Sequence, residues 1–520
     1  MIIKIIFLVV FFAVMIGVGI YCRKSAISVD GFVLGGRSVG PWLTAFAYGT
    51  SYFSAVIFVG YAGQFGWKFG VASTWIGIGN ALIGSLLAWV ILGRRTRVMT
   101  TYLETKTMPE FFEKRFGSSA LKIAASAIVF IFLIPYTASL YNGLSRLFES
   151  SFGIDYIYCV IGMAVLTGIY VIVGGYMATA VNDFIQGIIM LFGIVAVILA
   201  VLAQKGGFTE ALASLSKVPA ESNPELSGAF SSFFGPEPLA LLFVVLLTSL
   251  GTWGLPQMVQ KFYSIKSDSA VSKGTIISTI FALVVAGGCY FLGGFGRLFG
   301  DIVERNPETG AVIYDSIIPG MLKGLPDVVI GIVLILVVSA SMSTLSSLVL
   351  TSSSTLTLDM IVPASKRGGK SGMKEKSQML TMRVFIVFFI AVSAVIAIVQ
   401  AKSSVTFIAQ LMGVSWGALA GAFLAPFMLG LYMKRITKAA VWCSFASGVG
   451  IMTANLICTL TGTTFLNAFW ASPINSGVLA MAAGLVIVPI VSIFGGKKAK
   501  KDAESIFVCY DKKKKEDKAL

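Results

Sequence analysis

Long hydrophobic stretches with few or no charged residues alternate with short polar segments along the whole chain. Such a stretch crosses the ~30 Å hydrocarbon core of a bilayer as a helix when it holds about 20 residues. Thirteen stretches reach or approach this length, at 3–22, 41–66, 70–93, 123–145, 156–178, 184–204, 238–260, 274–298, 328–358, 384–401, 404–433, 439–460 and 475–495. The pattern predicts an all-α polytopic membrane protein with about 13 transmembrane helices.

The composition excludes most soluble classes of protein. Hydrophobic residues make up 56% of the 520 residues and charged residues only 12%, too few to cover the surface of a soluble fold. Histidine is absent, which removes the histidine pairs of hydrolases and histidine metal sites. The sequence has no nucleotide-binding loop and no polar segment long enough for an ATPase domain. We therefore expect no enzyme, and any transport should draw on an ion gradient.

The positions of lysine and arginine predict the orientation in the membrane. If the N-terminus is outside, most of the 40 basic residues fall on the cytoplasmic side, where lysine and arginine are enriched in membrane proteins. One of the predicted inside loops holds Lys261, Lys266 and Lys273. The formal net charge of +16 is then a topology signal rather than a nucleic-acid-binding surface. We expect a multi-pass protein of the plasma membrane with a cytoplasmic C-terminus. Its partners are the lipid bilayer and a small solute, with no nucleic acid and no obligate protein partner.

Two predicted spans are interrupted by residues that do not favour a straight helix. The second span contains Gly49 among hydroxyl and aromatic residues, and the seventh contains Gly251, Gly254 and Pro256. The two spans are offset by five, an odd number, so units that begin with them have opposite orientations. Paired breaks in inverted repeats are typical of transporters that bind solute near the bilayer midplane. A kink or close helix packing is the alternative for each glycine taken alone.

This symmetry divides the chain into six regions. They are a first transmembrane helix with its inside loop (1–40), a first five-helix repeat (41–204), an outside loop (205–237), a second five-helix repeat (238–433), two C-terminal helices (434–496) and a solvated basic cytoplasmic tail (497–520). We expect the solute to bind where the breaks of the two repeats meet, near Gly49–Ser54 and Gly251–Pro256.

Hydroxyl residues gather in the ninth span. Ser339, Ser343, Ser346 and Ser347 recur at spacings of three and four, so they share one helix face, and Thr344 lies beside them. Neutral hydroxyl oxygens suit an alkali cation that is bound and released quickly. The alternative is that these hydroxyls bond to their own helix or to a neighbour.

A single carboxylate, Asp183, opens the sixth predicted span directly after Asn182. A carboxylate near a membrane segment is a functional candidate. The alternative is an N-cap, because aspartate is common at the start of a helix.

Five motifs together resemble the sodium/solute symporter family over nearly the whole chain. They occur in the family's order and spacing, at Gly35–Gly40, Val173–Ala178, Asn182–Gly187, Gly254–Gln257 and Met342–Ser346. The resemblance implies thirteen helices, a LeuT-type core in spans 2–11 and sodium-coupled uptake by alternating access. Within the family, the chain is closest in pattern to sodium/proline and sodium/pantothenate symporters.

The resemblance also implies where sodium, the coupling ion, binds. The family's main site would use the backbone carbonyls of Thr50, Phe53 and Ala340 with the side chains of Ser343 and Thr344. A second site, which occurs in some members, would combine Asp183 with hydroxyls of the ninth span, namely Ser343, Ser346 and Ser347.

Several solute classes are compatible with the resemblance. Sodium/proline symporters share Tyr136 but have an aspartate where this chain has Tyr52. Sugar symporters have a Glu-Gln pair where this chain has Val56 and Ile57, which argues against a sugar. Pantothenate symporters look similar around Tyr52, and sialic acid symporters also import a carboxylate. We expect a small amino acid such as proline, or an organic carboxylate. Five residues are candidates to line its site, although each aromatic ring suits ordinary packing equally well: Tyr52, Ser54, Tyr136, Trp253 and Gln257.

Two other functions are alternatives to a symporter, the first of them on the same scaffold. An ion channel or a solute sensor is the first alternative to a symporter. The second is an intramembrane enzyme, which the absence of histidine and of a paired carboxylate site disfavours. Uptake that saturates with solute and requires a sodium gradient distinguishes a symporter from a channel.

Overall fold

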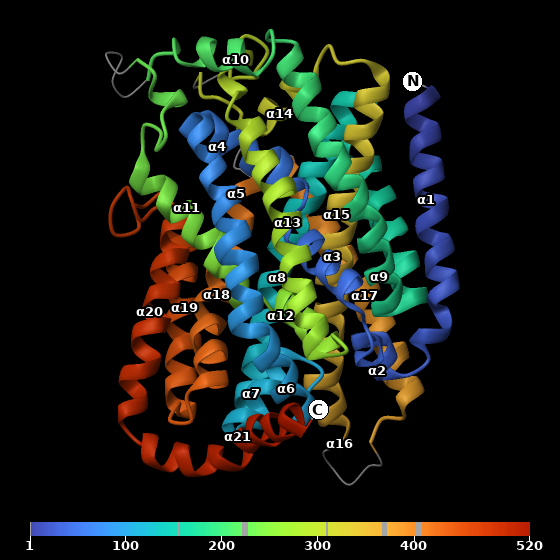
Figure 1. The fold of residues 1–520 in the computed structure, drawn as a ribbon, viewed down its shortest axis with the longest axis vertical. Helices are drawn as coiled ribbons and strands as arrows, with labels where there is room; N and C mark the ends of the chain where they lie inside the picture. Colours follow the sequence, from blue (N-terminus) through green and yellow to red (C-terminus); the bar gives the residue numbers. More distant parts are fainter. Residues whose placement is uncertain are drawn as a thin grey trace.

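The computed structural model describes residues 2–152, 155–220, 227–307, 310–366, 372–401 and 408–519. Within these ranges the protein is almost entirely helical, and its β-structure is limited to the isolated bridges Val39–Ile265 and Arg305–Val312. The helices stand side by side in one bundle, with the two chain ends at opposite ends of it (Figure 1). That placement agrees with an odd number of membrane crossings.

The α-helices of the first half are α1 (Ile2–Cys22), α2 (Val29–Leu34), α3 (Pro41–Tyr52), α4 (Ala62–Phe69), α5 (Thr74–Gly79), α6 (Arg94–Tyr102), α7 (Met108–Phe116), α8 (Ser119–Phe152), α9 (Tyr156–Ala203), α10 (Phe208–Leu215), α11 (Pro238–Leu250) and α12 (Pro256–Ser264). Those of the second half are α13 (Asp268–Gly293), α14 (Ile317–Leu322), α15 (Asp327–Thr355), α16 (Val362–Lys366), α17 (Glu375–Ala401), α18 (Ile408–Tyr432), α19 (Lys438–Leu460), α20 (Pro473–Ile493) and α21 (Gly496–Ala519). Short 3-10 and π segments join or extend them: η1 (Arg23–Ala26), η2 (Gly35–Arg37), η3 (Val56–Tyr61), η4 (Gly70–Ser73), η5 (Asn80–Leu87), η6 (Trp89–Gly93), η7 (Ala229–Ser231), η8 (Gly251–Gly254), η9 (Gly296–Phe299), η10 (Tyr314–Ser316) and η11 (Leu356–Ile361).

Ten helical segments of the described chain are long and apolar enough to cross a membrane, by length and composition. An eleventh is the bent pair Pro238–Gly254 and Pro256–Ser264, whose halves meet at 48°. Two of the ten are far longer than a bilayer requires: Val56–Tyr102 has 47 residues and Tyr156–Ala203 has 48. At 1.5 Å per residue each would extend about 70 Å, more than twice the hydrocarbon core.

Each of these long segments doubles back at a glycine. Gly70 has φ 62° and ψ −146°, and Gly175 has φ 57° and ψ −151°, a conformation that side-chain-bearing residues rarely adopt. Counting the legs on either side of each glycine separately gives the thirteen crossings that the sequence predicts. The sequence places the second reversal too late, because the turn lies within the predicted span 156–178 rather than after it.

Contacts with α13 make the reversal at Gly70 explicit. Gly66, before the turn, packs against the backbone of Gly293 at the end of α13. Gly93, after the turn, packs against Val271 near the beginning of α13. The two legs therefore run along α13 in opposite directions.

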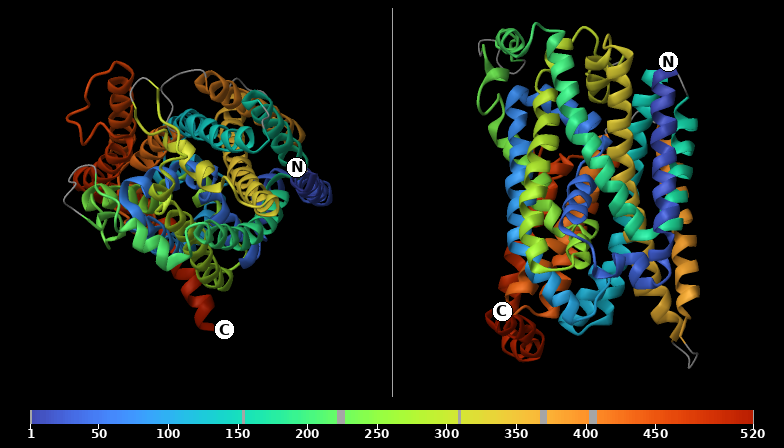
Figure 2. Two further views of the ribbon diagram at one scale, coloured as in Figure 1. Left: turned by 90° about the horizontal axis from the view of Figure 1, so that it is seen from above. Right: turned by 45° about the vertical axis from the view of Figure 1, so that its right-hand side comes forward.

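The interrupted helices lie at the centre of the bundle. The first, α3, contacts α9, α12, α13 and α15, and the second break, at η8 between α11 and α12, packs against α18. Seen from above, α1 lies at the outer edge and α20 on the opposite side of the bundle (Figure 2). The two breaks are thus surrounded by other helices, where backbone groups freed from the helical ladder are shielded from lipid.

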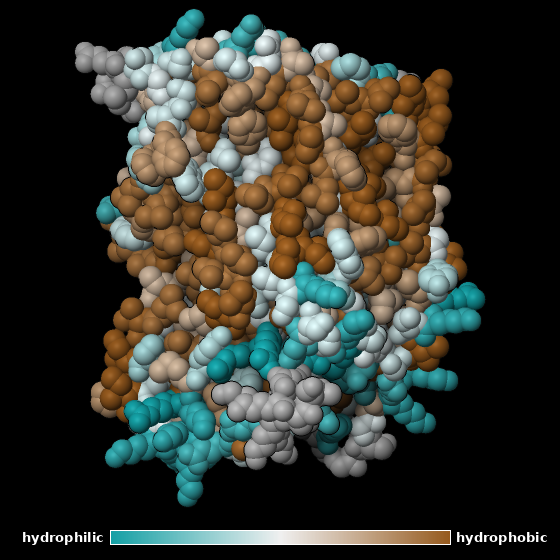
Figure 3. Space-filling model, viewed as in Figure 1, coloured by the Kyte–Doolittle hydropathy of each residue, from teal (hydrophilic) through white to brown (hydrophobic). Residues whose placement is uncertain are grey.

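The surface agrees with a membrane location. A broad hydrophobic region covers most of the bundle's height on the face shown in Figure 3, and hydrophilic residues gather at its lower end. Large apolar side chains are exposed along α9, including Phe192, Val195 and Leu199. A soluble protein would bury such a surface, whereas lipid tails solvate it.

The basic tail forms a helix, α21, in which Lys497, Lys498, Lys500 and Lys501 are exposed, while its apolar side chains pack against the bundle. Its Phe507 and Cys509 are buried, and the Phe507 ring lies 5.1 Å from the Arg115 guanidinium of α7. Tyr510 stacks on Arg95 at 4.7 Å. Lysines dominate the composition of the tail, but its few aromatic residues decide how it packs.

Candidate functional site

The first break lies between α3 and the helical segment that follows it. Phe53 is in the extended conformation directly after Tyr52, the last residue of α3. One turn earlier, a Cβ at Gly49 would lie 2.4 Å from the Phe281 ring, so the close approach of α3 to α13 requires glycine there. The break exposes backbone carbonyls of α3 to the hydroxyl residues of α15.

Two hydroxyls of α15 meet these carbonyls. The Thr344 hydroxyl lies 3.2 Å from the carbonyl oxygens of both Thr50 and Phe53 and 3.1 Å from that of Ala340. The Ser343 hydroxyl lies 3.0 Å from the carbonyl oxygens of Thr50 and Ala340. The structure therefore brings together all five residues that the resemblance assigns to the first sodium site.

This group of oxygens has more lone pairs than protons. A hydroxyl donates one hydrogen, so Ser343 and Thr344 together supply two, while three carbonyl and two hydroxyl oxygens can all accept. All five residues are buried, with exposed fractions of 0 to 1%. A cluster of neutral oxygens with surplus lone pairs is the ligand set that hard cations prefer.

The residues proposed for a second sodium site are arranged differently. Ser346 donates its hydroxyl to the carbonyl of Ser343 at 2.9 Å, within its own helix. Ser347 accepts a hydrogen bond of 2.9 Å from the ammonium of Lys261, and this ammonium lies 3.8 Å from a carboxylate oxygen of Asp183. Ser347 and Asp183 thus come together around a lysine that the sequence did not place there.

Lys261 lies inside the protein, so its assignment to an inside loop is wrong. It belongs to α12 and is 2% exposed, next to the Tyr176 ring at 5.2 Å. The predicted seventh span ended at residue 260, one residue short of it. In the sequence, Lys261 is a lysine in an otherwise uncharged stretch. Such a residue is typical both of the end of a span and of a buried ion pair.

The position of Asp183 also excludes the N-cap alternative. Its helix leg starts at the Gly175 turn, so Asp183 lies about two turns inside it. Asp183 is fully buried, and neither of its carboxylate oxygens has a hydrogen-bond partner among the described residues. Its attraction to Lys261 is therefore the main interaction that compensates its burial.

Four of the five predicted solute-site residues have buried polar atoms without a hydrogen-bond partner in the described ranges. These atoms are the hydroxyls of Tyr52, Ser54 and Tyr136 and both amide atoms of Gln257. The Tyr136 hydroxyl lies near Ser54 without reaching hydrogen-bonding geometry. Unsatisfied buried polar groups are costly, so several in one region point to a ligand or water. Trp253 differs, because its indole nitrogen donates to the carbonyl of Ile83 at 3.0 Å.

Trp416 of α18 lies beside the predicted aromatic residues of the solute site, although the sequence did not indicate it as a candidate. Its ring centroid lies 5.8 Å from that of Tyr52 and 5.9 Å from that of Tyr136, and its indole nitrogen has no partner in the described chain. It bridges the residues of α3 and α8. Nothing local distinguishes it in sequence from other tryptophans of the apolar spans.

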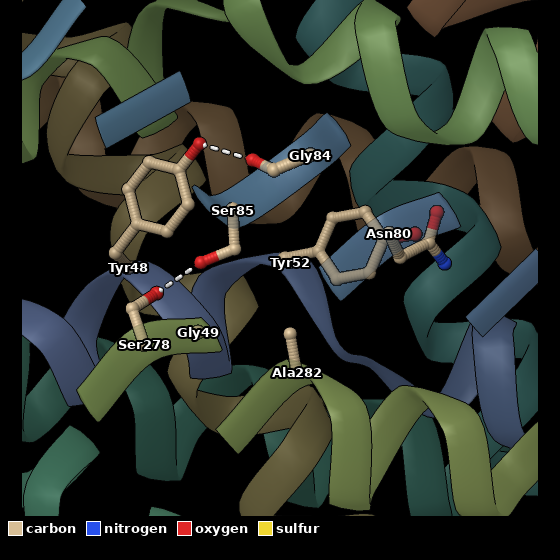
Figure 4. Close-up of a pocket in the computed structure, with 8 residues that line it drawn as sticks. All are labelled: Tyr48, Gly49, Tyr52, Asn80, Gly84, Ser85, Ser278 and Ala282. Atoms are coloured by element: carbon tan, nitrogen blue, oxygen red, sulfur yellow. Dashed lines mark hydrogen bonds between the residues drawn. The ribbon is translucent and has the colours of Figure 1, made fainter. Parts of the chain in front are cut away.

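A small cavity of about 10 Å³, enough for one water molecule, opens beside Tyr52 (Figure 4). Tyr52 and Asn80 both line it, and Ser85 bonds Ser278 at 2.8 Å on its wall. The Asn80 carbonyl accepts from Thr248 and Ser249 of α11, at 3.0 and 2.9 Å, but its amide nitrogen has no partner in the described residues. Asn80, the lone amide in its predicted span, is a second solute-site candidate that the sequence pattern did not indicate.

Comparison with known proteins adds independent findings. The sequence profile of the sodium:solute symporter family matches residues 32–448. "Sodium/proline symporter 2" of Staphylococcus saprophyticus is 28% identical, over 97% of this chain and 94% of that protein. The "osmoregulated proline transporter OpuE" of Bacillus subtilis is 27% identical, over 92% of this chain and 93% of that protein.

Two solved structures have the same fold. A Na⁺-coupled sialic acid symporter in an outward-open state superimposes with a TM-score of 0.74 at 18% identity, over 95% of this chain and 98% of that one. Mhp1, a nucleobase-cation-symport-1 family transporter, superimposes with a TM-score of 0.50 at 14% identity, over 91% of this chain and 98% of that one. At these identities the likeness establishes the helical architecture.

Proposed function

Because the chain belongs to the sodium:solute symporter family, and is thus a sodium-coupled transporter of a small solute rather than an enzyme, we propose that it imports a small amino acid such as proline, or a related organic carboxylate. Two similar proteins are named for proline, and their likeness extends over nearly the full chain. Uptake proceeds by alternating access, with sodium moving down its gradient. A channel or a sensor has no support from the family or from these relatives.

The observation that carries the proposal is the oxygen cluster at the break of α3. Thr50, Phe53 and Ala340 would bind one sodium ion through their carbonyls, with the hydroxyls of Ser343 and Thr344 completing the shell. These ligands come from two helices, α3 and α15. Binding would therefore hold α3 against α15, and release would free them to move apart, which links ion occupancy to conformation.

The solute would bind beside this ion, between α3, α8, α12 and α18. The first turn of α12, at Pro256 and Gln257, has the positive end of a helix dipole and suits a carboxylate. Tyr52, Tyr136 and Trp416 offer ring faces to an apolar body such as a pyrrolidine. Their unpartnered polar atoms would then hydrogen-bond the solute's charged groups.

This arrangement also supports the proposed division into inverted repeats, 41–204 and 238–433. Each repeat begins with an interrupted helix, α3 in the first and the α11–α12 pair in the second. We place the N-terminus outside and the C-terminus in the cytoplasm of the cell that holds the protein in its plasma membrane. The hydrophilic end of the bundle, which carries α21, would then be the cytoplasmic one (Figures 1 and 3).

Uptake into proteoliposomes tests the proposal. Radiolabelled proline should accumulate when an inward sodium gradient is imposed, saturate with proline concentration, and fail to accumulate when potassium replaces sodium. Competition by unlabelled amino acids, monocarboxylates and pantothenate would rank the solute classes. Uptake that is linear in solute or indifferent to sodium would contradict the proposal. A matching thermal-shift screen should find a solute that stabilises the protein only with sodium present.

A further inference from the structure

Lys261 lies at the centre of a cluster of buried polar side chains that has no role in the proposed transport cycle. Its ammonium donates to the Ser347 hydroxyl at 2.9 Å and lies 3.8 Å from Asp183 and 5.2 Å from the Tyr176 ring. Both charged residues are almost completely buried. The ammonium therefore takes up the two anchors, Asp183 and Ser347, that a second sodium ion would need.

The fold brings Lys261 to this place through the break in the seventh span. After Leu255 the chain turns by 48° into α12, which then runs along α15. Two neighbouring residues of α12 bond to residues one turn apart on α15: Lys261 to Ser347, and Gln260 to Thr351 at 2.8 Å. The lysine is thus fixed by its own helix as well as by its charge partner.

We propose that Lys261 is a tethered cation that occupies the position of a second transported sodium ion, so that the protein couples one sodium ion to each solute. This inference rests on the proposed function, because it assumes sodium binding at Thr344 and its neighbours. A sodium ion added between Asp183 and Ser347 would lie within a few ångströms of the ammonium, and two like charges would then share a single carboxylate. Of the two remaining hydroxyls, Ser346 is directed to its own helix, and Ser343 lies 3.0 Å from the Thr50 carbonyl of the first site.

The tethered cation is also connected to the proposed sodium site. Ser347, which the ammonium holds, exchanges a hydrogen bond of 2.8 Å with Ser51 of α3. Ser51 is the residue next to Thr50, whose carbonyl is a proposed sodium ligand. Along α15, Ser347 lies one turn, about 6 Å, from Ser343, so the lysine supports the first site without entering it. A permanent charge here would supply in every cycle what a second ion supplies only when bound.

The ratio of sodium to solute decides the inference, measured in proteoliposomes by the reversal potential. The wild type should transport one sodium ion per solute with a Hill coefficient for sodium near one. Lys261→Met removes the ammonium and frees Asp183, so its ratio should rise to two and its Hill coefficient should exceed one. Lys266→Met is the matched control, because this nearby lysine is exposed and should leave the ratio at one.

Removal of the ammonium leaves a buried carboxylate uncompensated, so Lys261→Met alone risks misfolding. The double variant Lys261→Met/Asp183→Asn replaces the ion pair with a neutral pair and should fold with a ratio of one. A ratio of two in the wild type, a ratio of one in folded Lys261→Met, or loss of sodium dependence in the folded double variant would overturn the inference. Sodium-independent uptake by the wild type would instead contradict the proposed function.

Discussion

Phe53 and Leu255 adopt nearly the same backbone conformation, with φ and ψ of −86° and 124° at Phe53 and −85° and 119° at Leu255. Each is an extended residue at a point where a central helix is interrupted. The two positions interrupt the first helices of the two proposed repeats, although their surrounding sequences differ. Nearly equal dihedral angles at both breaks favour the internal symmetry that the paired breaks in the sequence predict.

The first prediction concerns the proposed sodium site. Thr344→Ala or Ser343→Ala removes one oxygen ligand, so the sodium concentration for half-maximal uptake should rise. A lost polar contact of about 1–2 kcal/mol corresponds to a roughly five- to thirty-fold change. Ser341→Ala is the control, since this buried hydroxyl bonds Val337 at 2.9 Å within α15 and is no proposed ligand. Equal sodium dependence in all three variants would reject the site.

The second prediction tests whether Asp183 and Lys261 act as a pair in the folded protein. Asp183→Asn leaves the ammonium buried without a counter-charge, which should destabilise the protein by about 3–5 kcal/mol. The double variant with Lys261→Met should recover most of that loss. Thermal unfolding in detergent, arranged as a double-mutant cycle, measures the coupling. Additive losses in the double variant would contradict a pair.

The third prediction separates solute contacts from packing. Tyr52→Phe and Tyr136→Phe remove hydroxyls that have no partner among the described residues, so the unfolding temperature should stay equal or rise. The solute concentration for half-maximal uptake should nevertheless rise, roughly five-fold or more, if these hydroxyls bind solute. Tyr48→Phe is the matched comparison: its hydroxyl donates to the Gly84 carbonyl at 2.8 Å. That variant should lose about 1 kcal/mol of stability instead.

The fourth prediction is a pH dependence at the hydrophilic end. Partial burial raises the pKa of Glu113, but hydrogen bonds from Lys122 and Ser119 outweigh it, and the net pKa lies below the usual range. A lowered folded-state pKa stabilises the protein above the unfolded-state pKa, about 4.3, and this contribution disappears as the pH falls through the lowered value. Glu113→Gln should therefore remove part of the acid-induced fall in unfolding temperature.

The magnitude of that effect should be small. Glu113 is partly exposed, so solvent screening limits the contribution at neutral pH to less than about 1 kcal/mol. Glu504→Gln, at an exposed position of α21, serves as the control and should retain the wild-type acid profile. Identical acid profiles for wild type and Glu113→Gln would contradict the prediction.

The sequence predicts the spans and the breaks well because both are local signals. A long run of apolar residues is stable in a bilayer as a transmembrane helix. Glycine together with proline interrupts a helix at any position. The meeting of Thr344 with the α3 carbonyls follows from the family resemblance, and the structure brings the same residues together. What these atoms bind stays a prediction.

Lys261, Trp416 and Asn80 were missed because their roles depend on distant residues. A lysine at the edge of an apolar stretch reads as an interface residue until its partner is known, and that partner, Asp183, lies on another helix. Trp416 is distinguished only by the two tyrosines that its ring meets. Such long-range pairs have no periodicity or composition by which a single sequence could reveal them.

The tight reversals at Gly70 and Gly175 have a practical consequence for mapping this protein. Helical residues continue to within a few positions of each glycine, and an added Cβ at Gly70 would lie 2.0 Å from the Phe230 carbonyl oxygen. Proteases, antibodies and inserted epitope tags need an accessible loop, and neither turn offers one. Neither cleavage nor a reporter insertion would therefore detect these two turns. A topology drawn from accessible loops alone would record two hairpins fewer than the chain contains.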